Sequence, residues 1–294
     1  MNISCTLCPR QCGASRTDER TCGGCGVTAA PRVARAALHF GEEPCISGQN
    51  GSGTVFFSGC PLHCRFCQNH VISQEGFGNE ISPARLADIF RELEDAGAHN
   101  LNLVSGTQFV PAIRQALSLY RPSVPVVYNS GGYERVETLK TLEGLVDVYL
   151  PDFKYADNAL GAALSGVPDY ADRAAAAVLE MARQTGPMQL DEYGIARRGT
   201  MVRHLVLPGH TKNSLAVLDW LAENLPHGCF VSLMFQYTPL RDIDGFPSLS
   251  RRLTRREREK VFDHLLDLGL TDGYAQEAES ASAVYIPNFD LTGV

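Results

Sequence analysis

From Thr54 onward the sequence alternates between short apolar segments and longer amphipathic ones, and this alternation restricts the fold more than any other feature. Runs of β-branched and aromatic residues predict six strands, at 54–58, 101–105, 124–129, 146–150, 202–207 and 230–235. The segments between them predict helices, the clearest at 82–93, 110–120, 134–142, 170–185, 214–225 and 254–268. Such alternation implies parallel strands joined by right-handed crossovers. Since a closed barrel of this kind needs eight units, the sequence predicts an α/β fold, a partial (β/α)6 TIM-like barrel.

Two of these helices begin with recognisable capping residues. Ser82 is followed by Pro83, which suits the first helical position, and Leu86 then begins the apolar face. Thr254 and Glu257 have the spacing of a capping box. Both signals support helices that start at these points.

A C-x3-C-x2-C triplet, formed by Cys60, Cys64 and Cys67, directly follows the first predicted strand. Active-site loops in α/β folds follow the carboxyl ends of the strands, so the triplet stands where chemistry is expected. Three thiolates can hold three irons of a four-iron cluster and leave the fourth open, whereas a closed cluster uses four. The alternative is zinc with His63 or His70 as fourth ligand, but zinc sites usually pair two separate short arms. The spacing therefore favours iron.

A second group of cysteines lies at the start of the chain, where five of the ten cysteines occur within the first 25 residues. A segment this small needs a staple to become ordered, and its cysteine spacings are typical of metal ligands. Zinc and an auxiliary iron–sulfur cluster fit equally well. The predicted ligands of this second metal site are Cys5, Cys8, Cys12 and Cys22, with Cys25 as an alternative to Cys22.

The chain is accordingly divided into a Cys-rich segment at 1–50, the barrel core at 51–270 and a carboxyl-terminal tail at 271–294. Cys45 lies outside both cysteine groups and is a candidate further ligand or functional thiol, whereas Cys229, at the start of a strand, fits an apolar filler.

Composition excludes several classes of partner. The net charge is -7 and the pI is about 5.6, which disfavours binding to nucleic acid. No stretch approaches 18 uncharged apolar residues, so the sequence predicts a soluble, cytoplasmic protein without a membrane partner. Because the cytosol keeps thiols reduced, the cysteines are expected to bind metal rather than to form disulfides.

Polar residues follow several of the later strands and should lie at the same end of the barrel as the triplet. Asn129 ends the third strand, Asp152 and Lys154 follow the fourth, and Gln236 and Tyr237 follow the sixth. A carboxylate and an ammonium at the mouth of a strand could bind a charged ligand or could pair with each other and orient the loop.

The triplet, with the aromatic Phe66 before its last cysteine, resembles the signature of the radical S-adenosylmethionine (SAM) superfamily. Motifs such as Val127-Tyr-Asn-Ser-Gly-Gly-Tyr-Glu and Tyr149-Leu-Pro-Asp-Phe-Lys-Tyr extend the resemblance to the PflX-like branch, which is related to pyruvate formate-lyase activating enzymes. The resemblance implies a [4Fe-4S] cluster on the triplet and SAM beside it. It implies SAM contacts from Phe66, near the adenine, and from Gly106 and Thr107, near the methionine amine; Asn129, Asp152 and Lys154 are further candidate SAM contacts.

The expected function is reductive cleavage of SAM to a 5'-deoxyadenosyl radical, which abstracts hydrogen from an unidentified substrate. The resemblance also implies an external one-electron reductant such as flavodoxin or ferredoxin, and it allows a protein substrate if the chain activates a glycyl radical enzyme. Such activases often carry extra cysteines after the triplet, whereas here they come first. The alternative is a non-enzymatic electron-transfer module that binds iron–sulfur or zinc.

Overall fold

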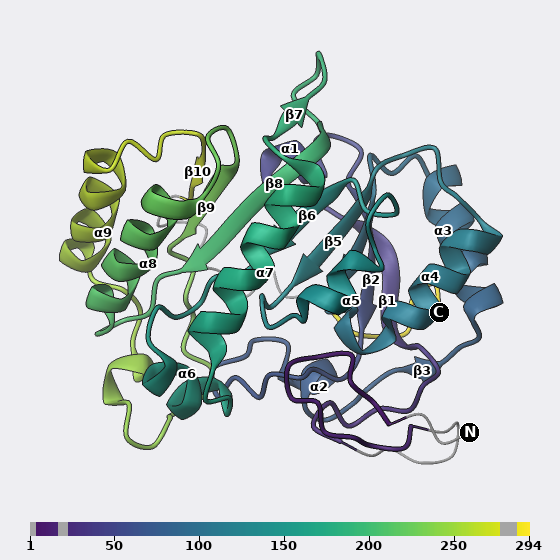
Figure 1. The fold of residues 1–294 in the computed structure, drawn as a ribbon, viewed down its shortest axis with the longest axis horizontal. Helices are drawn as coiled ribbons and strands as arrows, with labels where there is room; N and C mark the ends of the chain where they lie inside the picture. The colour runs from purple at the N-terminus through teal and green to yellow at the C-terminus, as the bar shows by residue number, and fades with distance from the viewer. Residues whose placement is uncertain (1–3, 17–22, 277–286) are drawn as a thin grey trace.

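The computed structural model describes residues 4–16, 23–276 and 287–294. Within these residues one sheet runs in the order β10-β9-β8-β6-β5-β4-β2-β1-β3 (Figure 1). Its parallel strands are β2 (Ser52–Phe57), β4 (Leu101–Val104), β5 (Val126–Ser130), β6 (Val148–Pro151), β8 (Ala196–Leu205), β9 (Phe230–Met234) and β10 (Gly273–Ala275). Because this path has two ends, the described strands form a partial barrel, as predicted.

All six predicted strands are confirmed, although β8 begins six residues earlier than expected. Its extra residues pair with the short antiparallel strand β7 (Gln189–Leu190) in a hairpin that projects beyond the sheet. Charged residues on that hairpin hide its strand character from a pattern of apolar residues. The strand β10 was not predicted and adds a seventh parallel member.

The Cys-rich segment is less separate from the barrel than its composition indicated. Within it, β1 (Arg32–His39) pairs antiparallel with β2, and β3 (Asn79–Glu80) continues the sheet beyond β1. The part of the expected 1–50 segment that follows residue 31 therefore includes an integral strand of the sheet.

The helices follow the strands as the alternation predicted. They are α1 (Pro44–Ser47), α2 (His70–Ser73), α3 (Pro83–Asp95), α4 (Val110–Leu119), α5 (Val136–Lys140), α6 (Asn158–Ser165), α7 (Tyr170–Thr185), α8 (Thr211–Asn224) and α9 (Arg255–Asp267). Both capping predictions are confirmed: Ser82 Oγ accepts from Arg85 N at 3.1 Å, and Thr254 with Glu257 forms a capping box. Helix α6 was not predicted, because it is short and contains a glycine.

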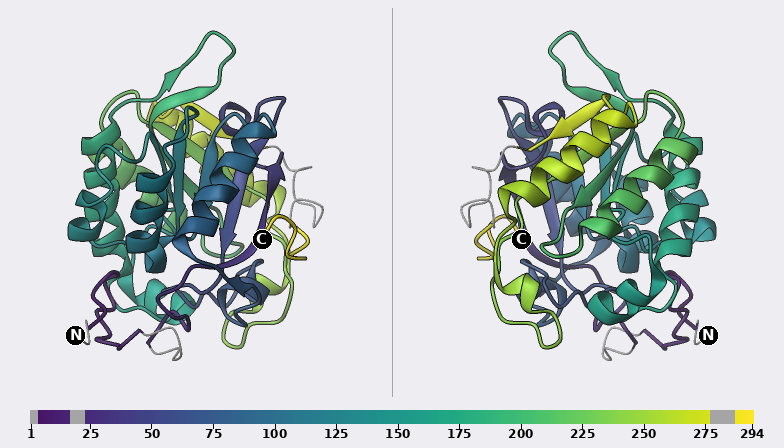
Figure 2. Two further views of the ribbon diagram at one scale, coloured as in Figure 1. Left: turned by 90° about the vertical axis from the view of Figure 1, so that its right-hand side faces the viewer. Right: turned by 90° about the vertical axis from the view of Figure 1, so that its left-hand side faces the viewer.

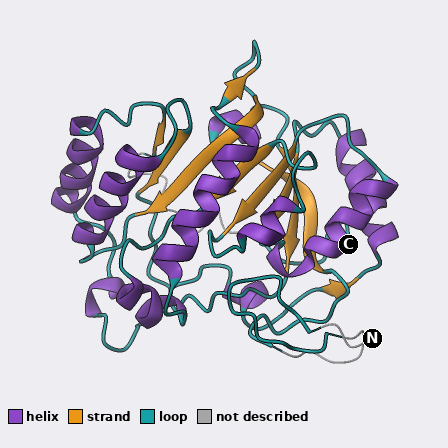
Figure 3. Ribbon diagram, in the orientation of Figure 1, coloured by secondary structure: helices purple, strands orange, loops and turns teal. Residues whose placement is uncertain are grey.

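The longer helices lie over one face of the sheet (Figure 3), and the carboxyl-terminal residues lie on the side away from these helices (Figure 2). On the helical side, Leu86, Ile89 and Phe90 of α3 are fully buried against the sheet, which is the face that the sequence indicated. Burial of each such side chain contributes about 1.5–3 kcal/mol. This layer fixes the positions of the strand ends. In the described part of the chain, no helix is long and apolar enough to cross a membrane.

The last residues of the chain lie along β1. Ala36 N donates to Thr292 O at 2.8 Å, and Leu291 N donates to Ala34 O at 3.1 Å. Phe289 packs edge-on against Phe56, with ring centroids 5.6 Å apart. The tail therefore covers the outer edge of β1, which would otherwise present unpaired backbone groups.

Candidate active site

A cavity of about 250 Å³ lies at the carboxyl ends of the parallel strands. Its wall includes the triplet Cys60, Cys64 and Cys67 together with residues from β5, β6 and β8 and the loops that follow them. Pro287 of the tail also contributes. The structure thus gathers, in one cavity, groups that are separated by more than 200 positions in the sequence.

The triplet loop begins at Gly59, whose φ of 77° lies in the left-handed region. A side chain there would also meet Cys25 O at 2.6 Å, so only glycine suits this turn. Each cysteine of the triplet has a hydrogen-bond donor beside its sulfur: Leu62 N at 3.4 Å from Cys60 Sγ, Ser165 Oγ at 3.0 Å from Cys64 Sγ, and Ser73 Oγ at 3.4 Å from Cys67 Sγ.

The environment of these sulfurs suits a metal cluster. Burial raises the pKa of Cys60 well above its ordinary value and raises the pKa of Cys64 to about 11. Thiols in such surroundings give up their protons only when a positive partner compensates the charge, and bound iron supplies one. Three sulfurs around one cavity, each near a donor, therefore fit an iron–sulfur cluster with three cysteine ligands.

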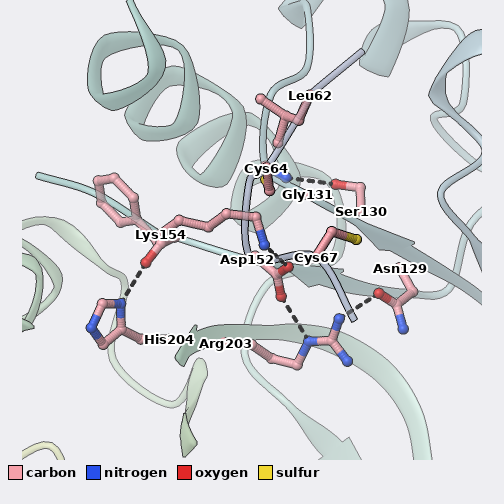
Figure 4. Close-up of polar contacts among 12 residues, drawn as sticks. Leu62, Cys64, Cys67, Asn129, Ser130, Gly131, Asp152, Lys154, Arg203 and His204 are labelled. Carbon is pink, nitrogen blue, oxygen red and sulfur yellow. Dashed lines mark hydrogen bonds and ion pairs between the residues drawn. The ribbon is translucent and has the colours of Figure 1, made fainter. Parts of the chain in front are cut away.

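On the same cavity wall, charged side chains form a largely buried chain of contacts (Figure 4). Lys154 Nζ lies 2.5 Å from Asp152 Oδ2, and Arg203 Nε lies 3.1 Å from Asp152 Oδ1. Burial alone would raise the pKa of Asp152, but the charges of Lys154 and Arg203 outweigh it and hold the pKa below its ordinary value. Asp152 and Lys154 do form the mutual ion pair that the sequence allowed, and both still line the cavity.

Arg203 extends this network to two further residues. Its guanidinium donates to Asn129 Oδ1 at 2.5 Å (Figure 4). It also donates to Glu42 Oε2 at 3.0 Å. Glu42 and Arg203 both line the cavity, and sequence reasoning assigned a role to neither. Two features of the sequence could have pointed to them: the adjacent carboxylates Glu42 and Glu43 precede a proline, and Arg203 is a charged residue in a largely apolar strand.

Asn129 lines the cavity, whereas Gly106 and Thr107, which follow β4, do not. Gly106 packs on α4, where an added Cβ would lie 2.7 Å from Ile113 Cδ1. The Thr107 hydroxyl donates to buried Glu134 Oε1 at 2.5 Å. Neither Gly106 nor Thr107 lines the main cavity; Ser105, with φ of 60°, lines it instead. A non-glycine residue in that conformation is uncommon and marks the turn as specially shaped.

The aromatic residues expected near a ligand lie together on the cavity wall. The rings of Phe66 and Tyr237 have centroids 6.3 Å apart and are tilted by 59°. Gln236 lines the same wall. These predicted residues are brought together by the triplet loop and by the segment after β9.

The described part of the Cys-rich segment packs directly on the triplet loop. Arg10 Nε donates to Pro61 O at 2.5 Å, and Arg10 Nη2 donates to Gly166 O at 3.0 Å. His63 Nε2 lies 2.5 Å from Gly24 O. This segment therefore forms part of the support of the cavity.

The second predicted metal site is only partly described, because Cys22 lies outside the described residues. Cys5 and Cys8 lie in a turn closed by a hydrogen bond from Cys5 N to Ala14 O at 3.0 Å. Burial raises the pKa of Cys8 to about 11, and Cys12 is exposed. Among the described residues, no three His, Cys, Asp or Glu side chains are grouped as ligands of a single metal ion.

Cys45 and Cys229 lie away from the cavity wall. Cys45, in α1, is 1% exposed and packs with apolar residues of β5 and β6. Cys229 is also buried, and its thiol faces Gly186 O at 3.5 Å. Both occupy positions typical of small apolar residues.

Residues 54–221, more than half of the chain, match the family model of the radical SAM superfamily. The chain belongs to that superfamily, whose members bind SAM and an iron–sulfur cluster. It is 34% identical over 270 residues to an uncharacterized protein of Methanocaldococcus jannaschii, an alignment that covers 88% of this chain and 73% of that protein.

Two solved structures share the fold at low sequence identity. A radical SAM methyltransferase from Sphaerobacter thermophilus is 14% identical, with a TM-score of 0.53 over 76% of this chain and 66% of that one. Streptococcus suis SuiB, bound to its precursor peptide SuiA, is 15% identical, with a TM-score of 0.51 over 74% of this chain. This chain spans about half the length of SuiB, since the match covers 46% of that chain.

Proposed function

We propose that this protein is a SAM-dependent radical enzyme in which Cys60, Cys64 and Cys67 hold a [4Fe-4S] cluster and the adjoining cavity binds SAM. The observation that carries the proposal is one cavity that joins the three cysteines of the triplet to a largely buried set of charged groups. When bound and reduced, the cluster supplies an electron that cleaves SAM and generates a carbon radical able to abstract hydrogen.

The chain contributes binding and orientation. Phe66 and Tyr237 offer aromatic faces for the adenine. Asp152 and Lys154 provide one charge of each sign at the strand mouth, and Asn129 an amide, so they suit the hydroxyls and the zwitterionic end of SAM. Gly106 and Thr107 are proposed to affect SAM binding indirectly, because they follow Ser105 in the turn that forms part of the cavity wall.

The proposal extends to the substrate from which the radical abstracts hydrogen. One version makes the chain an activase that abstracts hydrogen from a glycine of a partner enzyme, and hence an oxidoreductase acting on a protein. Anaerobic incubation with candidate partners tests this version, because activation leaves a glycyl radical that is visible by electron paramagnetic resonance. A small-molecule substrate would leave no such signal on a partner protein.

An external one-electron donor such as flavodoxin or ferredoxin is proposed to reduce the cluster. The protein is proposed to act in the cytoplasm. The Cys-rich segment is proposed to hold zinc or an auxiliary iron–sulfur cluster through Cys5, Cys8, Cys12 and Cys22. Metal analysis of anaerobically purified protein tests this site: zinc found beside the iron of the triplet cluster indicates zinc there, whereas iron in excess of one four-iron cluster per chain indicates an auxiliary cluster.

The competing function is an electron-transfer module that uses the cysteines only as ligands. The charged residues on the cavity wall favour the enzyme, because a module that only relays electrons has no need of Asp152, Lys154 and Arg203 beside its cluster. The two functions differ in a direct chemical assay.

The assay is anaerobic reconstitution with iron and sulfide, followed by dithionite and SAM. We expect 5'-deoxyadenosine from the wild type and none above the no-enzyme blank from Cys64→Ala, because three irons need three thiolates. Cys229→Ala is the matched control: it removes an equally buried thiol away from the cavity and should keep wild-type product.

A fully loaded wild type that makes no 5'-deoxyadenosine would favour the electron-transfer module. Normal turnover by Cys64→Ala would overturn the ligand assignment.

A further inference from the structure

The carboxyl end of α6 is joined to the triplet loop on both sides of Cys64. His63 N donates to Ser165 O at 3.1 Å, and Arg65 N donates to Leu164 O at 2.8 Å. Between these two backbone contacts, Ser165 Oγ lies 3.0 Å from Cys64 Sγ. Ser165 is fully buried, so the contact is shielded from water.

The direction of this hydrogen bond follows from the chemistry of the cysteine. A sulfur bound to iron is a thiolate and carries no proton, so Ser165 must donate its single hydroxyl proton to it. Ser165 Oγ then accepts from Tyr155, whose hydroxyl lies 2.7 Å away. Tyr155 is also fully buried. The result is a chain of two hydrogen bonds, called the relay below, in which Tyr155 donates to Ser165 and Ser165 donates to Cys64.

The other two triplet sulfurs have weaker donors. Leu62 N and Ser73 Oγ each lie 3.4 Å from Cys60 Sγ and Cys67 Sγ, respectively. Among the described residues, Cys64 has the shortest contact with a donor, and its donor is itself polarised by a second hydroxyl. Hydrogen bonds in a buried chain strengthen one another because the surroundings screen them poorly.

We propose that Ser165 and Tyr155 are positioning residues that raise the reduction potential of the cluster through Cys64. Reduction adds a negative charge to the cluster, and a donor to a ligand sulfur stabilises that charge. The proposal rests on the proposed function only in requiring a cluster at the triplet. It adds that two residues outside the cluster ligands, Ser165 and Tyr155, set part of the reduction potential of that cluster.

The test is an anaerobic redox titration of the reconstituted protein, followed by electron paramagnetic resonance of the reduced cluster. Loss of a hydrogen bond that favours the reduced cluster by about 0.5–1.5 kcal/mol should lower the ratio of reduced to oxidised cluster about twofold to tenfold at a given solution potential. For a one-electron couple, tenfold corresponds to about 59 mV. We expect this shift in Ser165→Ala and a smaller one, in the same direction, in Tyr155→Phe.

Two variants serve as matched controls. Ser52→Ala removes a buried serine hydroxyl that donates to Asn100 Oδ1 at 2.6 Å, at the opposite end of β2. Tyr149→Phe removes a buried phenol that donates to Gln184 Oε1 at 2.7 Å on the helical side of β6. Both should titrate like the wild type.

The possible outcomes separate the two proposals. A wild type that assembles no four-iron cluster contradicts the proposed function itself. A wild type that does assemble one, with Ser165→Ala and Tyr155→Phe titrating as the controls do, contradicts the relay alone. If Ser165→Ala fails to retain its cluster, Tyr155→Phe decides: a lowered potential supports the relay and an unchanged one overturns it.

Discussion

At the scale of single residues, Arg203 organises the polar half of the cavity. It contacts Asp152, Glu42 and Asn129, which come from separate parts of the chain. Burying a carboxylate without a partner costs several kcal/mol, and this guanidinium stabilises Glu42 and, together with Lys154, Asp152. The planar guanidinium contacts the three partners through three different nitrogens, Nε, Nη1 and Nη2, and the single nitrogen of a lysine cannot reproduce that spacing.

His204, the next residue on β8, faces the opposite side of the strand and supports the same region. Its Nδ1 lies 2.7 Å from Phe153 O, and its Nε2 lies 2.9 Å from Ser214 Oγ. Because a carbonyl can only accept, Nδ1 carries the proton and Nε2 accepts from the serine. This neutral imidazole holds the loop that contains Asp152 and Lys154 against α8.

Burial lowers the pKa of His204 from 6.5 to about 4, which predicts a pH dependence of stability. Between these values the unfolded chain binds one more proton than the folded one, so the free energy of unfolding should fall as the pH falls from 6.5 towards 4. The slope from this residue is up to about 1.4 kcal/mol per pH unit. Denaturation in urea across this window measures it.

The variant His204→Gln can donate and accept but cannot take up a proton, so it should lose this part of the pH dependence. The exposed His227→Gln is the control and should follow the wild type. Equal slopes for His204→Gln and the wild type would contradict the assignment of a neutral, buried imidazole.

At the scale of elements, the loops after β5 and β6 are fitted closely to each other. Gly132, after β5, has φ of 78°, and an added Cβ would lie 2.0 Å from Asp152 O, after β6. Tyr170 of α7 connects the same two loops, since its hydroxyl lies 2.8 Å from Gly131 O and 2.9 Å from Asp152 O. The position of Asp152 in the cavity therefore depends on backbone contacts between neighbouring units.

Substitution Gly132→Ala should displace Asp152 and weaken SAM binding as well as stability. Gly144→Ala is the control, because Gly144 has φ of 76° and nothing within 4 Å of an added Cβ. Both variants bear the cost of a left-handed alanine, about 1–2 kcal/mol, and only Gly132→Ala should bear a further 1–3 kcal/mol or so from the clash. Thermal unfolding and calorimetric titration with SAM, done anaerobically, measure the two effects. Equal losses in both variants would show that the contact with Asp152 is unimportant.

At the scale of the whole molecule, segments near both ends of the chain pack against the sheet: the first lies at the carboxyl ends of the strands, and the last lies along the edge strand β1. The Cys-rich segment packs below the triplet loop, and the tail covers β1 (Figure 1). The Arg10 side chain links the first segment to two parts of the barrel at once, the triplet loop and the end of α6.

Replacing Arg10 by Ala should loosen that segment from the barrel. We expect limited proteolysis to cut within the first 25 residues severalfold faster, because local opening costs less free energy when these contacts are lost. The loaded variant should also lose its cluster absorbance faster in air. Arg173→Ala, which removes an exposed ion pair with Asp169, should leave both rates unchanged. Unchanged proteolysis of the Arg10 variant would show that other contacts hold the segment.

The sequence by itself determined the six central strands, the capped helices α3 and α9 and the place of the triplet after the first parallel strand. These features depend on local periodicity, capping chemistry and the rule that parallel strands end at one edge, all of which can be read over short windows. The same rule placed Asn129, Asp152 and Lys154 in the cavity, because Asn129 lies at the carboxyl end of β5 and both Asp152 and Lys154 follow β6.

Only the tertiary structure decided which distant groups meet. The local sequence around Ser165, Glu42 and Arg203 does not reveal their roles, because these depend on distant partners: Ser165 contacts Cys64 across 101 positions, and Arg203 contacts Glu42 across 161. The turn after β4 shows the same limit: packing of Gly106 on α4 turns that residue away from the cavity and leaves Ser105 on its wall. Short-range patterns determine where strands and helices begin, whereas burial and hydrogen bonding between elements determine which side chains share a cavity.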